Sequence, residues 1–401
     1  MDVDGGAVEI AKLRLWLSLI VDEEEAKQIK PLPNLDFKIV SGNSLIGFPF
    51  KSKGLHEIEK LKAQFFEETD HNRKSKLKVE IEHKLRDCFA SSKQSLGFEV
   101  NFDFEIDFSE VFRNRRGFDV VIANPPYLGE KGHKELFRVI AISPLGKRFY
   151  QGKMDLFYFF FHLALDLINS TGTAALITTN YYGTPTGATS LRSDLKMRSM
   201  VRSMVNFNEV HIFESALGQH NMITVLQKGS DPELEAKTCN TRRRGFADAE
   251  LLKAIVSRTD PETEYFSVPQ KLSYESDVNY ICLSGRSSSS SQEPVQRLLS
   301  KMHTSPHSLG QLLSINQGIV TAADKVSPKH LMKYTLNADA GDGIFVLSDE
   351  EVAQLKLTEA DVNILKPWFK NSDVHRWVTS VATDQKLIFA DKRLNNLELV
   401  A

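Results

Sequence analysis

The order of apolar and helical patterns predicts an α/β fold with a parallel sheet. Residues 120–123 and 173–183 are short apolar runs, typical of strands that are buried on both faces of a sheet. Residues 155–168 form a longer apolar stretch between them, which favours a buried helix. A strand, a helix and a strand in succession indicate parallel neighbours joined by a helical crossover. Four aromatic residues of this helix are expected in the core: Phe157, Phe159, Phe160 and Phe161.

The flanking segments continue this alternation. The stretch 7–21 has apolar residues at helical spacing, and 37–47 has the pattern of a strand that ends in a Gly-Asn turn. The segment from about residue 51 to 95 is rich in Lys and Glu, and its apolar residues are spaced as on amphipathic helices. We therefore expect an inserted helical hairpin there. Two further strands are expected at 205–213 and 221–229, and the second of them closes this unit.

The composition is that of a soluble globular protein with two or more units, since 41% of the 401 residues are hydrophobic and 25% are charged. The chain has 50 Lys and Arg residues and 52 Asp and Glu residues, so it carries no overall positive charge. A surface that binds nucleic acid would therefore have to be a local cluster of basic residues. The three cysteines are isolated, which indicates neither a zinc site nor a disulfide framework and favours a reducing cytoplasm. The most apolar stretch is shorter than the about 20 residues of a spanning helix, so no membrane is expected.

The sequence FDVVIANPPYLG, residues 118–129, ends a predicted strand in an unusual way. Pro125 forces Asn124 out of the helical region, and Pro126 constrains Pro125 in the same manner, so the backbone leaves the sheet extended. Neither proline has an N–H, so the Asn124 side-chain oxygen and the Pro125 carbonyl can converge on one external donor. The Tyr127 ring can lie flat beside that donor. This ending therefore suits a planar amino group.

The motif and its neighbours together carry a family resemblance. An acidic residue near the start of the chain precedes NPPY, and the segments KMDLFYFFF and ALITTNYYGT follow it. In this order they resemble amino-methyltransferases that use S-adenosylmethionine, in particular the adenine-N6 DNA methyltransferases of type IIG restriction-modification proteins. The resemblance covers residues 1–229. The segments LLSINQGIVTAADKV and LKPWFKNSDVHRW are more weakly similar to the start of the target-recognition domain of those proteins.

The resemblance implies a Rossmann-like methyltransferase domain at 1–230, a connecting region at 231–305 and part of a DNA target-recognition domain at 306–401. The first strand of the family sheet, with the glycine-rich turn that holds the methionine end of the cofactor, has no counterpart in this sequence. The sequence also contains no counterpart of the nuclease domain found in type IIG proteins. We therefore expect a chain that is incomplete at both ends and works with a separate amino-terminal segment or nuclease domain.

The chemistry explains why this motif is needed. The lone pair of an adenine amino group is delocalised into the ring, so a catalyst must accept its protons and favour a tetrahedral nitrogen. The resemblance gives this role to Asn124 and the Pro125 carbonyl, within a catalytic motif that also contains Pro126 and Tyr127. The sulfonium methyl group of the cofactor is already activated, so we expect no metal, general base or covalent intermediate.

The target base must be flipped out of the duplex and held by stacking on aromatic residues. Tyr127 is the expected platform. By resemblance, a second aromatic wall comes from the loop before the last strand, where Phe213 is the candidate and His220 is its rival.

The cofactor that the resemblance implies is S-adenosylmethionine. In such folds an acidic residue at the end of the second strand binds the ribose hydroxyls, and a residue after the third strand contacts the adenine of the cofactor. Asp2 and Asn43 match these two places, with Asp4 as a less favoured ribose ligand. Asp155 resembles a position near the cofactor, but an N-cap of the following helix is the alternative interpretation and the favoured one.

The predicted function is site-specific methylation of adenine N6 in double-stranded DNA, within a prokaryotic restriction-modification system in the cytoplasm. One alternative is methylation of a glutamine amide in a protein, because NPPY suits any planar amino group. The other is a DNA-binding fragment without catalysis. The basic run TRRRG, residues 241–245, could contact DNA phosphates, but a solvated surface is the more common use of such a run.

Overall fold

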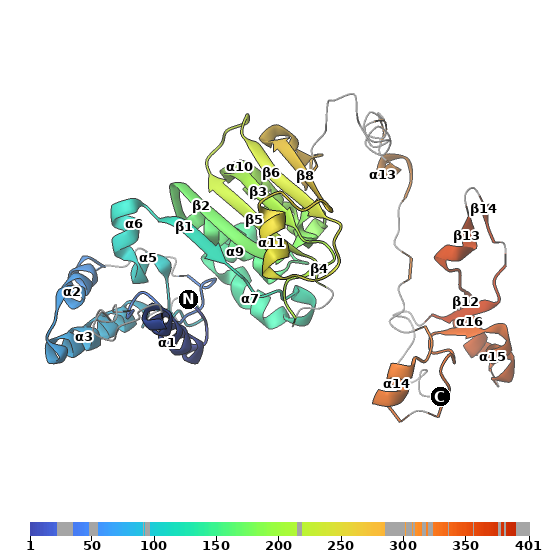
Figure 1. Cartoon of the computed structure of the whole chain (residues 1–401). Helices are drawn as coiled ribbons and strands as arrows, with labels where there is room; N and C mark the ends of the chain where they lie inside the picture. Colours follow the sequence, from blue (N-terminus) through green and yellow to red (C-terminus); the bar gives the residue numbers. More distant parts are fainter. Residues whose placement is uncertain are drawn as a thin grey trace. The chain divides into compact units, whose positions relative to one another are not determined.

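The computed structural model divides into two compact units, Met1–Leu298 and Leu299–Ala401 (Figure 1). The structure describes residues 1–21, 35–47, 55–90, 92, 97–214, 219–284, 301, 307, 309–314, 318–319, 324–335, 337–355, 357–375, 378–380 and 382–389. None of the helices within these ranges is both long and apolar enough to cross a bilayer.

A six-stranded sheet forms the centre of the amino-terminal unit. In spatial order, its strands are β1 (Phe118–Ala123), β2 (Ile168–Thr179), β5 (Asn221–Lys228), β3 (Ser199–Asn206), β6 (Glu235–Thr241) and β8 (Thr263–Pro269) (Figure 1). β1 is parallel to β2, and β3 is parallel to β6, whereas β5 runs antiparallel to both β2 and β3, and β8 runs antiparallel to β6.

The α/β class is confirmed, but the prediction of a parallel sheet is wrong, because the sheet is mixed. A parallel neighbour needs a long crossover, usually a helix, whereas an antiparallel neighbour can follow a short connection. The described residues between β3 and β5 form no helix that could carry the chain back along the sheet. β5 therefore returns antiparallel beside β3, and this inserts it between two strands that run in the opposite direction.

Helix α9 (Leu156–Leu167) carries the chain from β1 to β2 and packs on one face of the sheet. Three of its aromatic side chains, Phe157, Phe159 and Phe161, are at most 1% exposed and belong to the main core. The predicted buried crossover helix is therefore confirmed. The neighbouring helices are α7 (Lys134–Ile142), α8 (Pro144–Phe149) and α10 (Thr189–Arg198).

The opposite face of the sheet is covered by α11 (Ala249–Val256). Successive residues of a strand point to opposite faces, and Met204 of β3 belongs to the main core whereas Val205 belongs to a second cluster. That cluster consists of Val205, Phe207, Val210, Cys239 and Ile255. β6 and β8 complete the sheet after residue 230, so part of the range predicted as a connecting region contributes strands to it.

The predicted helical insertion is a pair of helices, α2 (Leu55–Glu67) and α3 (His71–Phe89), which meet through buried Ile58, Phe65 and Ile81. The other amino-terminal helices are α1 (Gly5–Val21), α5 (Phe104–Asp107) and α6 (Ser109–Arg115). The strand predicted at 37–47 is wrong. This segment forms turns, with Phe37 at a φ of 59°, and its pairing consists of one parallel bridge between Ser41 and Asp2 among the described residues.

The remaining elements of this unit are short. They are β4 (Val210–His211), β7 (Gly245–Phe246), β9 (Tyr274–Glu275) and β10 (Tyr280–Ile281), with 3-10 turns at Glu130–Gly132, Asn180–Gly183, Thr186–Ala188 and Gln270–Leu272. β4 pairs with β7 in parallel, and β9 pairs with β10 antiparallel.

The carboxyl-terminal unit contains a small antiparallel sheet of β11 (Val346–Ser348), β15 (Gln385–Ile388) and β12 (Leu365–Pro367), in this spatial order. Its helices are α13 (Leu309–Leu312), α14 (Pro328–Lys333), α15 (Asp349–Gln354) and α16 (Glu359–Ile364), and it also has β13 (Val374–His375), β14 (Val378–Thr379) and a 3-10 turn at Asn371–Asp373. A capping box fixes the start of α14, α15 and α16.

Candidate active site

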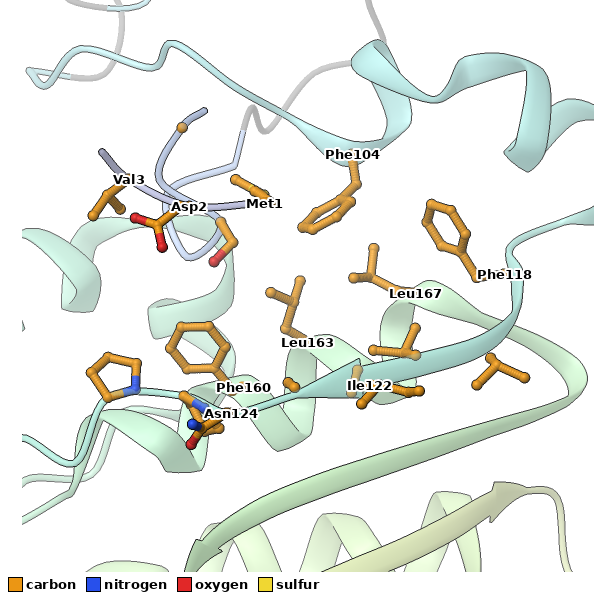
Figure 2. A pocket seen from close by; sticks show the side chains of 18 of the residues that line it. Met1, Asp2, Val3, Phe104, Phe118, Ile122, Asn124, Phe160, Leu163 and Leu167 are labelled. Carbon is orange, nitrogen blue, oxygen red and sulfur yellow. The ribbon is translucent and has the colours of Figure 1, made fainter. Parts of the chain in front are cut away.

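A cavity of about 1010 Å³ lies beside β1 in the amino-terminal unit (Figure 2). Figure 2 shows the end of β1 and Phe160 of α9 along one side, with residues 1–3 and Phe104 across from them. Its lining includes Asp2, Phe104, Ile122, Asn124, Pro125, Pro126, Tyr127, Phe160, Phe213 and Gln219. The cavity thus combines apolar walls with a few polar side chains, which is the usual make-up of a small-molecule site.

β1 lies along this cavity, and its lining residues include Val120, Val121, Ile122 and Ala123. Val120 and Ile122 are 58% and 81% exposed, whereas Val121 and Ala123 pack against the main core. The prediction that this strand is buried on both faces is therefore wrong. β1 is the edge strand of the described sheet and pairs only with β2 there, so one of its faces has no covering layer.

Phe160 differs from the three other aromatic residues of its helix. It packs against the main core but is only partly buried and also lines the cavity, so the prediction that it is a core residue like Phe157, Phe159 and Phe161 is confirmed only in part. Phe160 and Leu163 lie on the side of α9 that faces the cavity next to β1 (Figure 2).

The four residues of the NPPY motif follow β1 directly, and all of them line the cavity. Asn124 and Pro126 are exposed, whereas Pro125 is buried. The Tyr127 hydroxyl lies 3.3 Å from Oδ1 of Asn124 and 3.1 Å from the carbonyl oxygen of Ile177 in β2. The Tyr127 side chain therefore points back toward the sheet, and its hydroxyl lies next to the Asn124 side chain.

The Tyr127 ring is partly buried between the cavity and the core. It meets Phe157 edge to face, with ring centroids 6.1 Å apart and an interplanar angle of 79°. Burial raises the pKa of the Tyr127 hydroxyl, and a hydrogen bond from Asn221 opposes this effect only in part. The hydroxyl is therefore protonated at neutral pH and can donate a hydrogen bond.

The two candidates for the second aromatic wall lie in different places. Phe213 lines the cavity together with Gln219. His220 is not among the lining residues: its Nδ1 lies 2.7 Å from the carbonyl oxygen of Asn208, and its ring meets Tyr181 edge to face at 6.0 Å. The geometry thus favours Phe213 over its rival.

Asp2 also lines the cavity, and its side chain is exposed. Its Oδ1 accepts a hydrogen bond from the Asp4 N–H at 2.9 Å, and its backbone is tied to Gly42 at 2.9 Å. Asp4 itself accepts from the Gly6 N–H at 2.7 Å, at the start of α1. Of the two candidate ribose ligands, Asp2 is therefore the one at the cavity.

Asn43 does not line the cavity, although its neighbours Gly42 and Ser44 do. Its Oδ1 accepts a hydrogen bond from the Leu45 N–H at 3.1 Å, so the side chain holds its own turn together. The structure therefore brings the loop of Asn43 to the cavity but not the Asn43 side chain.

Asp155 lies outside the cavity wall as well. It is the N-cap residue of α9, as the alternative interpretation predicted, but its side chain makes no capping hydrogen bond. The carboxyl group instead hydrogen-bonds Tyr158, and burial raises the pKa of Asp155. A bridge between Asp155 and Gly129 ties the start of α9 to the chain that leaves the NPPY motif.

Residues 1–213 match the family described as Eco57I restriction-modification methylase, and this range is more than half of the chain. The chain belongs to this family. The resemblance to the methyltransferases of restriction-modification proteins is thereby confirmed.

A relative of this family member is a protein of Methanocaldococcus jannaschii that is named as a type II restriction enzyme and methyltransferase. The two are 25% identical over a region that covers 57% of this chain and 25% of the relative. The chain therefore spans about a quarter of the length of that curated relative.

Two solved structures are similar to this Eco57I-family chain. A modification subunit of a type I restriction enzyme from Vibrio vulnificus is 16% identical and has a TM-score of 0.30, with 42% of this chain and 37% of that chain covered. The type IIG restriction endonuclease BpuSI is 17% identical and has a TM-score of 0.28, with 38% and 19% covered. TM-scores this low do not establish a shared overall fold.

Two of the three arginines in the TRRRG run are held by carboxylates. Arg242 is paired with Glu264, and Arg243 lies 2.7 Å from both Asp260 and Glu262. Among the described residues, no group of three or more His, Cys, Asp or Glu side chains is arranged to hold a metal ion.

Asn221 is a residue of the site that sequence reasoning missed. It is 1% exposed at the start of β5, and its Nδ2 lies 3.4 Å from the Tyr127 hydroxyl oxygen. The antiparallel register places it opposite Thr179 at the end of β2. The position of Asn221 beside Tyr127 depends on the antiparallel pairing of β5 with β2. The apolar pattern of β5 alone does not predict that pairing, so it could not identify Asn221.

Proposed function

We propose that this chain is the catalytic part of a DNA methyltransferase in a restriction-modification system, which transfers a methyl group from S-adenosylmethionine to adenine N6 in double-stranded DNA. The observation that carries the proposal is the convergence of Asn124 and Tyr127 at one end of the cavity, in a chain of the restriction-modification methylase family. A nuclease domain or a separate amino-terminal segment is the further partner that the family context suggests.

Asn124 acts as an acceptor for the target amino group. Its side chain is exposed at the end of a rigid strand, and the two prolines that follow supply no competing N–H. As the amino nitrogen attacks, its protons become more acidic and the nitrogen becomes pyramidal. Oδ1 of Asn124 and the carbonyl of Pro125 then accept those protons in hydrogen bonds that strengthen in the transition state.

Tyr127 and Phe213 hold the flipped base. Both line the cavity, and the edge-to-face contact with Phe157 fixes the Tyr127 ring from behind. Stacking on such aromatic faces offsets part of the few kcal/mol needed to take a base out of the duplex.

The cavity suits the adenosyl part of the cofactor. Its volume of about 1010 Å³ is at the upper end of ligand pockets, which measure about 300–1,000 Å³. The exposed carboxylate of Asp2 would bind the ribose hydroxyls, Phe104 and Phe160 would flank the adenine, and the loop of Asn43 would approach it. Bound there, S-adenosylmethionine supplies an activated methyl group, so the chain needs no nucleophile of its own.

The carboxyl-terminal unit is proposed to be part of the target-recognition domain. Support for this comes from the weak sequence resemblance of two of its segments, and a direct measurement of DNA binding by a chain without this unit would test it.

The experiment that tests the function is transfer of radiolabelled methyl groups by the full-length protein. Duplex DNA is incubated with labelled S-adenosylmethionine and digested to nucleosides, and the label is expected in N6-methyladenine. The Asn124→Ala variant should lose this product, whereas Asn101→Ala, an exposed residue outside the cavity lining, should retain it. Label in methylcytosine, or in a glutamine-containing protein and not in DNA, would contradict the proposal.

A further inference from the structure

The side chain of Asn221 is buried beside the catalytic motif. It is 1% exposed, it begins β5, and the strand register holds it opposite Thr179. A buried amide group needs hydrogen-bond partners, and the Nδ2 of Asn221 finds the Tyr127 hydroxyl oxygen at 3.4 Å. Hydrogen bonds in a free active site are often long and shorten when substrate binds.

The Tyr127 hydroxyl has one proton and two acceptors within reach. The Ile177 carbonyl oxygen lies at 3.1 Å and Oδ1 of Asn124 lies at 3.3 Å. Because Nδ2 of Asn221 can only donate, the Tyr127 oxygen must act as an acceptor on that side. The O–H proton is therefore directed toward Ile177 and Asn124.

This arrangement also discriminates between the two orientations of the Asn124 amide. With Oδ1 toward Tyr127, the amide accepts the hydroxyl proton. With the amide reversed, its NH₂ group would be a second amide donor crowded against the same oxygen as Nδ2 of Asn221, and the hydroxyl proton could no longer bond to Asn124. The contact with Asn221 thus favours the orientation in which the Asn124 oxygen lies inward.

We propose that Asn221 is a positioning residue for the methyl transfer, which acts on Asn124 through the Tyr127 hydroxyl. This inference rests on the proposed function. In the empty site the hydroxyl proton is shared between the Ile177 carbonyl oxygen and Oδ1 of Asn124, and this bond orients the Asn124 side chain. When the target amino group approaches, the O–H rotates to the Ile177 carbonyl and releases Oδ1 to accept the substrate proton. No covalent bond changes in this step, and the Asn221 contact is kept throughout.

A double-mutant cycle of Asn221→Leu and Tyr127→Phe tests the inference in the full-length protein. Asn221→Leu should lower kcat roughly tenfold, of the order expected when one hydrogen bond to a catalytic group is lost, with KM for S-adenosylmethionine unchanged. In the Tyr127→Phe background the same change should have almost no effect, because the hydroxyl through which it acts is absent.

Asn221→Asp provides a second variant of the same size. Its ionised carboxylate accepts the hydroxyl proton permanently, so Asn124 is no longer oriented before the substrate arrives, and kcat should fall at high pH. A buried carboxyl group has a raised pKa, and once protonated it can donate as the amide did, so activity should recover as the pH falls. A merely structural role would not produce this recovery.

Asn206→Leu is the matched control. Asn206 is also a buried asparagine at the same edge of the sheet, but it is bonded to Asn180 and Asn240. Its effect should be equal in the Tyr127 and Tyr127→Phe backgrounds. If Asn221→Leu lowers kcat by the same factor in both backgrounds, or if Asn221→Asp shows no recovery at low pH, Asn221 is not a positioning residue. If the wild-type protein methylates no adenine, the proposed function fails, and this inference fails with it.

Discussion

Nδ1 of His162 in α9 lies 2.6 Å from Oδ2 of Asp194 in α10, and both side chains are buried. Asp194 is also bonded to Arg198 at 2.6 Å, and the ring of Phe149 stacks on the imidazole at 3.7 Å. Nε2 of His162 is buried and finds no hydrogen-bond partner among the described residues. The imidazole is therefore neutral, with its proton on Nδ1, because a second N–H would be buried without an acceptor.

This pair predicts a loss of stability at mildly acidic pH. Burial lowers the pKa of His162 in the folded chain, although the bond to Asp194 opposes this, whereas an unfolded histidine has a pKa of about 6.5. Below that value the unfolded state binds more protons than the folded state, so the free energy of unfolding should fall as the pH falls through about 6.5. Urea unfolding between pH 5 and 8 measures this slope.

His162→Gln should flatten this pH dependence, whereas the exposed His133→Gln should leave it unchanged. Asp194 does not contribute in this window. Burial raises the pKa of its carboxyl group, but the hydrogen bonds from His162 and Arg198 outweigh that effect and hold the pKa below its usual value. Equal slopes for wild type and His162→Gln would show that His162 is not the group responsible.

Asp107 predicts a pH effect of the opposite sign. Burial raises the pKa of Asp107 from 3.8 to about 6, against a hydrogen bond from the Asp103 N–H at 3.1 Å. A folded pKa above the unfolded one means that stability is lost as the pH rises between these two values. Asp107→Asn should therefore raise the free energy of unfolding at pH 7 by about 1–3 kcal/mol, since one pKa unit corresponds to about 1.4 kcal/mol.

The same substitution should have much less effect at pH 3.5, where the Asp107 carboxyl group is protonated in the folded state and mostly protonated in the unfolded state. Glu105→Gln, on the same short helix but exposed, serves as the control and should change stability by less than about 0.5 kcal/mol at either pH. Thermal and urea unfolding at the two pH values measure the difference. A stabilisation that is equal at both pH values would contradict the assignment to the Asp107 carboxyl group.

The sequence predicts those elements whose pattern is local. The apolar stretch at 155–168 is long enough for a helix, and the run at 120–123 is bounded by a motif that only extended backbone accommodates, so α9 and β1 are placed correctly. The helical pair at 55–89 follows from its amphipathic spacing for the same reason.

What the sequence does not predict depends on distant pairing. The antiparallel insertion of β5 between β2 and β3 cannot be seen in the apolar pattern of β5, which suits either direction. The exposed face of β1 follows from its place at the edge of the described sheet, and Phe160 lines the cavity because of that edge. Asn221 joins the site only through the register of β5 on β2.

Asn124→Ala should reduce methyl transfer by roughly 10²-fold or more, the cost of removing one preorganised hydrogen-bonding group from a transition state. Affinity for S-adenosylmethionine should be nearly unchanged, because Asn124 contacts the target amino group in this mechanism. Single-turnover transfer of labelled methyl groups to duplex DNA gives the rate, and calorimetry gives the affinity. Near-normal turnover would remove Asn124 from the mechanism.

Tyr127→Ala and Tyr127→Phe should separate stacking from hydrogen bonding. Alanine removes base stacking worth about 1–3 kcal/mol, whereas phenylalanine keeps the ring and its contact with Phe157. The fluorescence of 2-aminopurine at the target position should therefore report base flipping by Tyr127→Phe but much less by Tyr127→Ala. Turnover by Tyr127→Phe should nevertheless fall, since the hydroxyl that holds Asn124 is lost. Equal fluorescence for the two variants would exclude a stacking role.

Asp2 should contribute to cofactor binding through its carboxylate, which is exposed and lines the cavity. Asp2→Ala removes a charged acceptor for the ribose hydroxyls, and a hydrogen bond to a charged group is worth about 1.5–3 kcal/mol, so the Kd for S-adenosylmethionine should rise roughly tenfold or more. Asp4→Asn is the matched control, because an amide oxygen can still accept from the Gly6 N–H at the start of α1. Titration calorimetry of the full-length protein measures both. If Asp2→Ala binds the cofactor as tightly as Asp4→Asn, Asp2 does not bind the ribose, and the proposed cofactor site in the cavity beside β1 is contradicted.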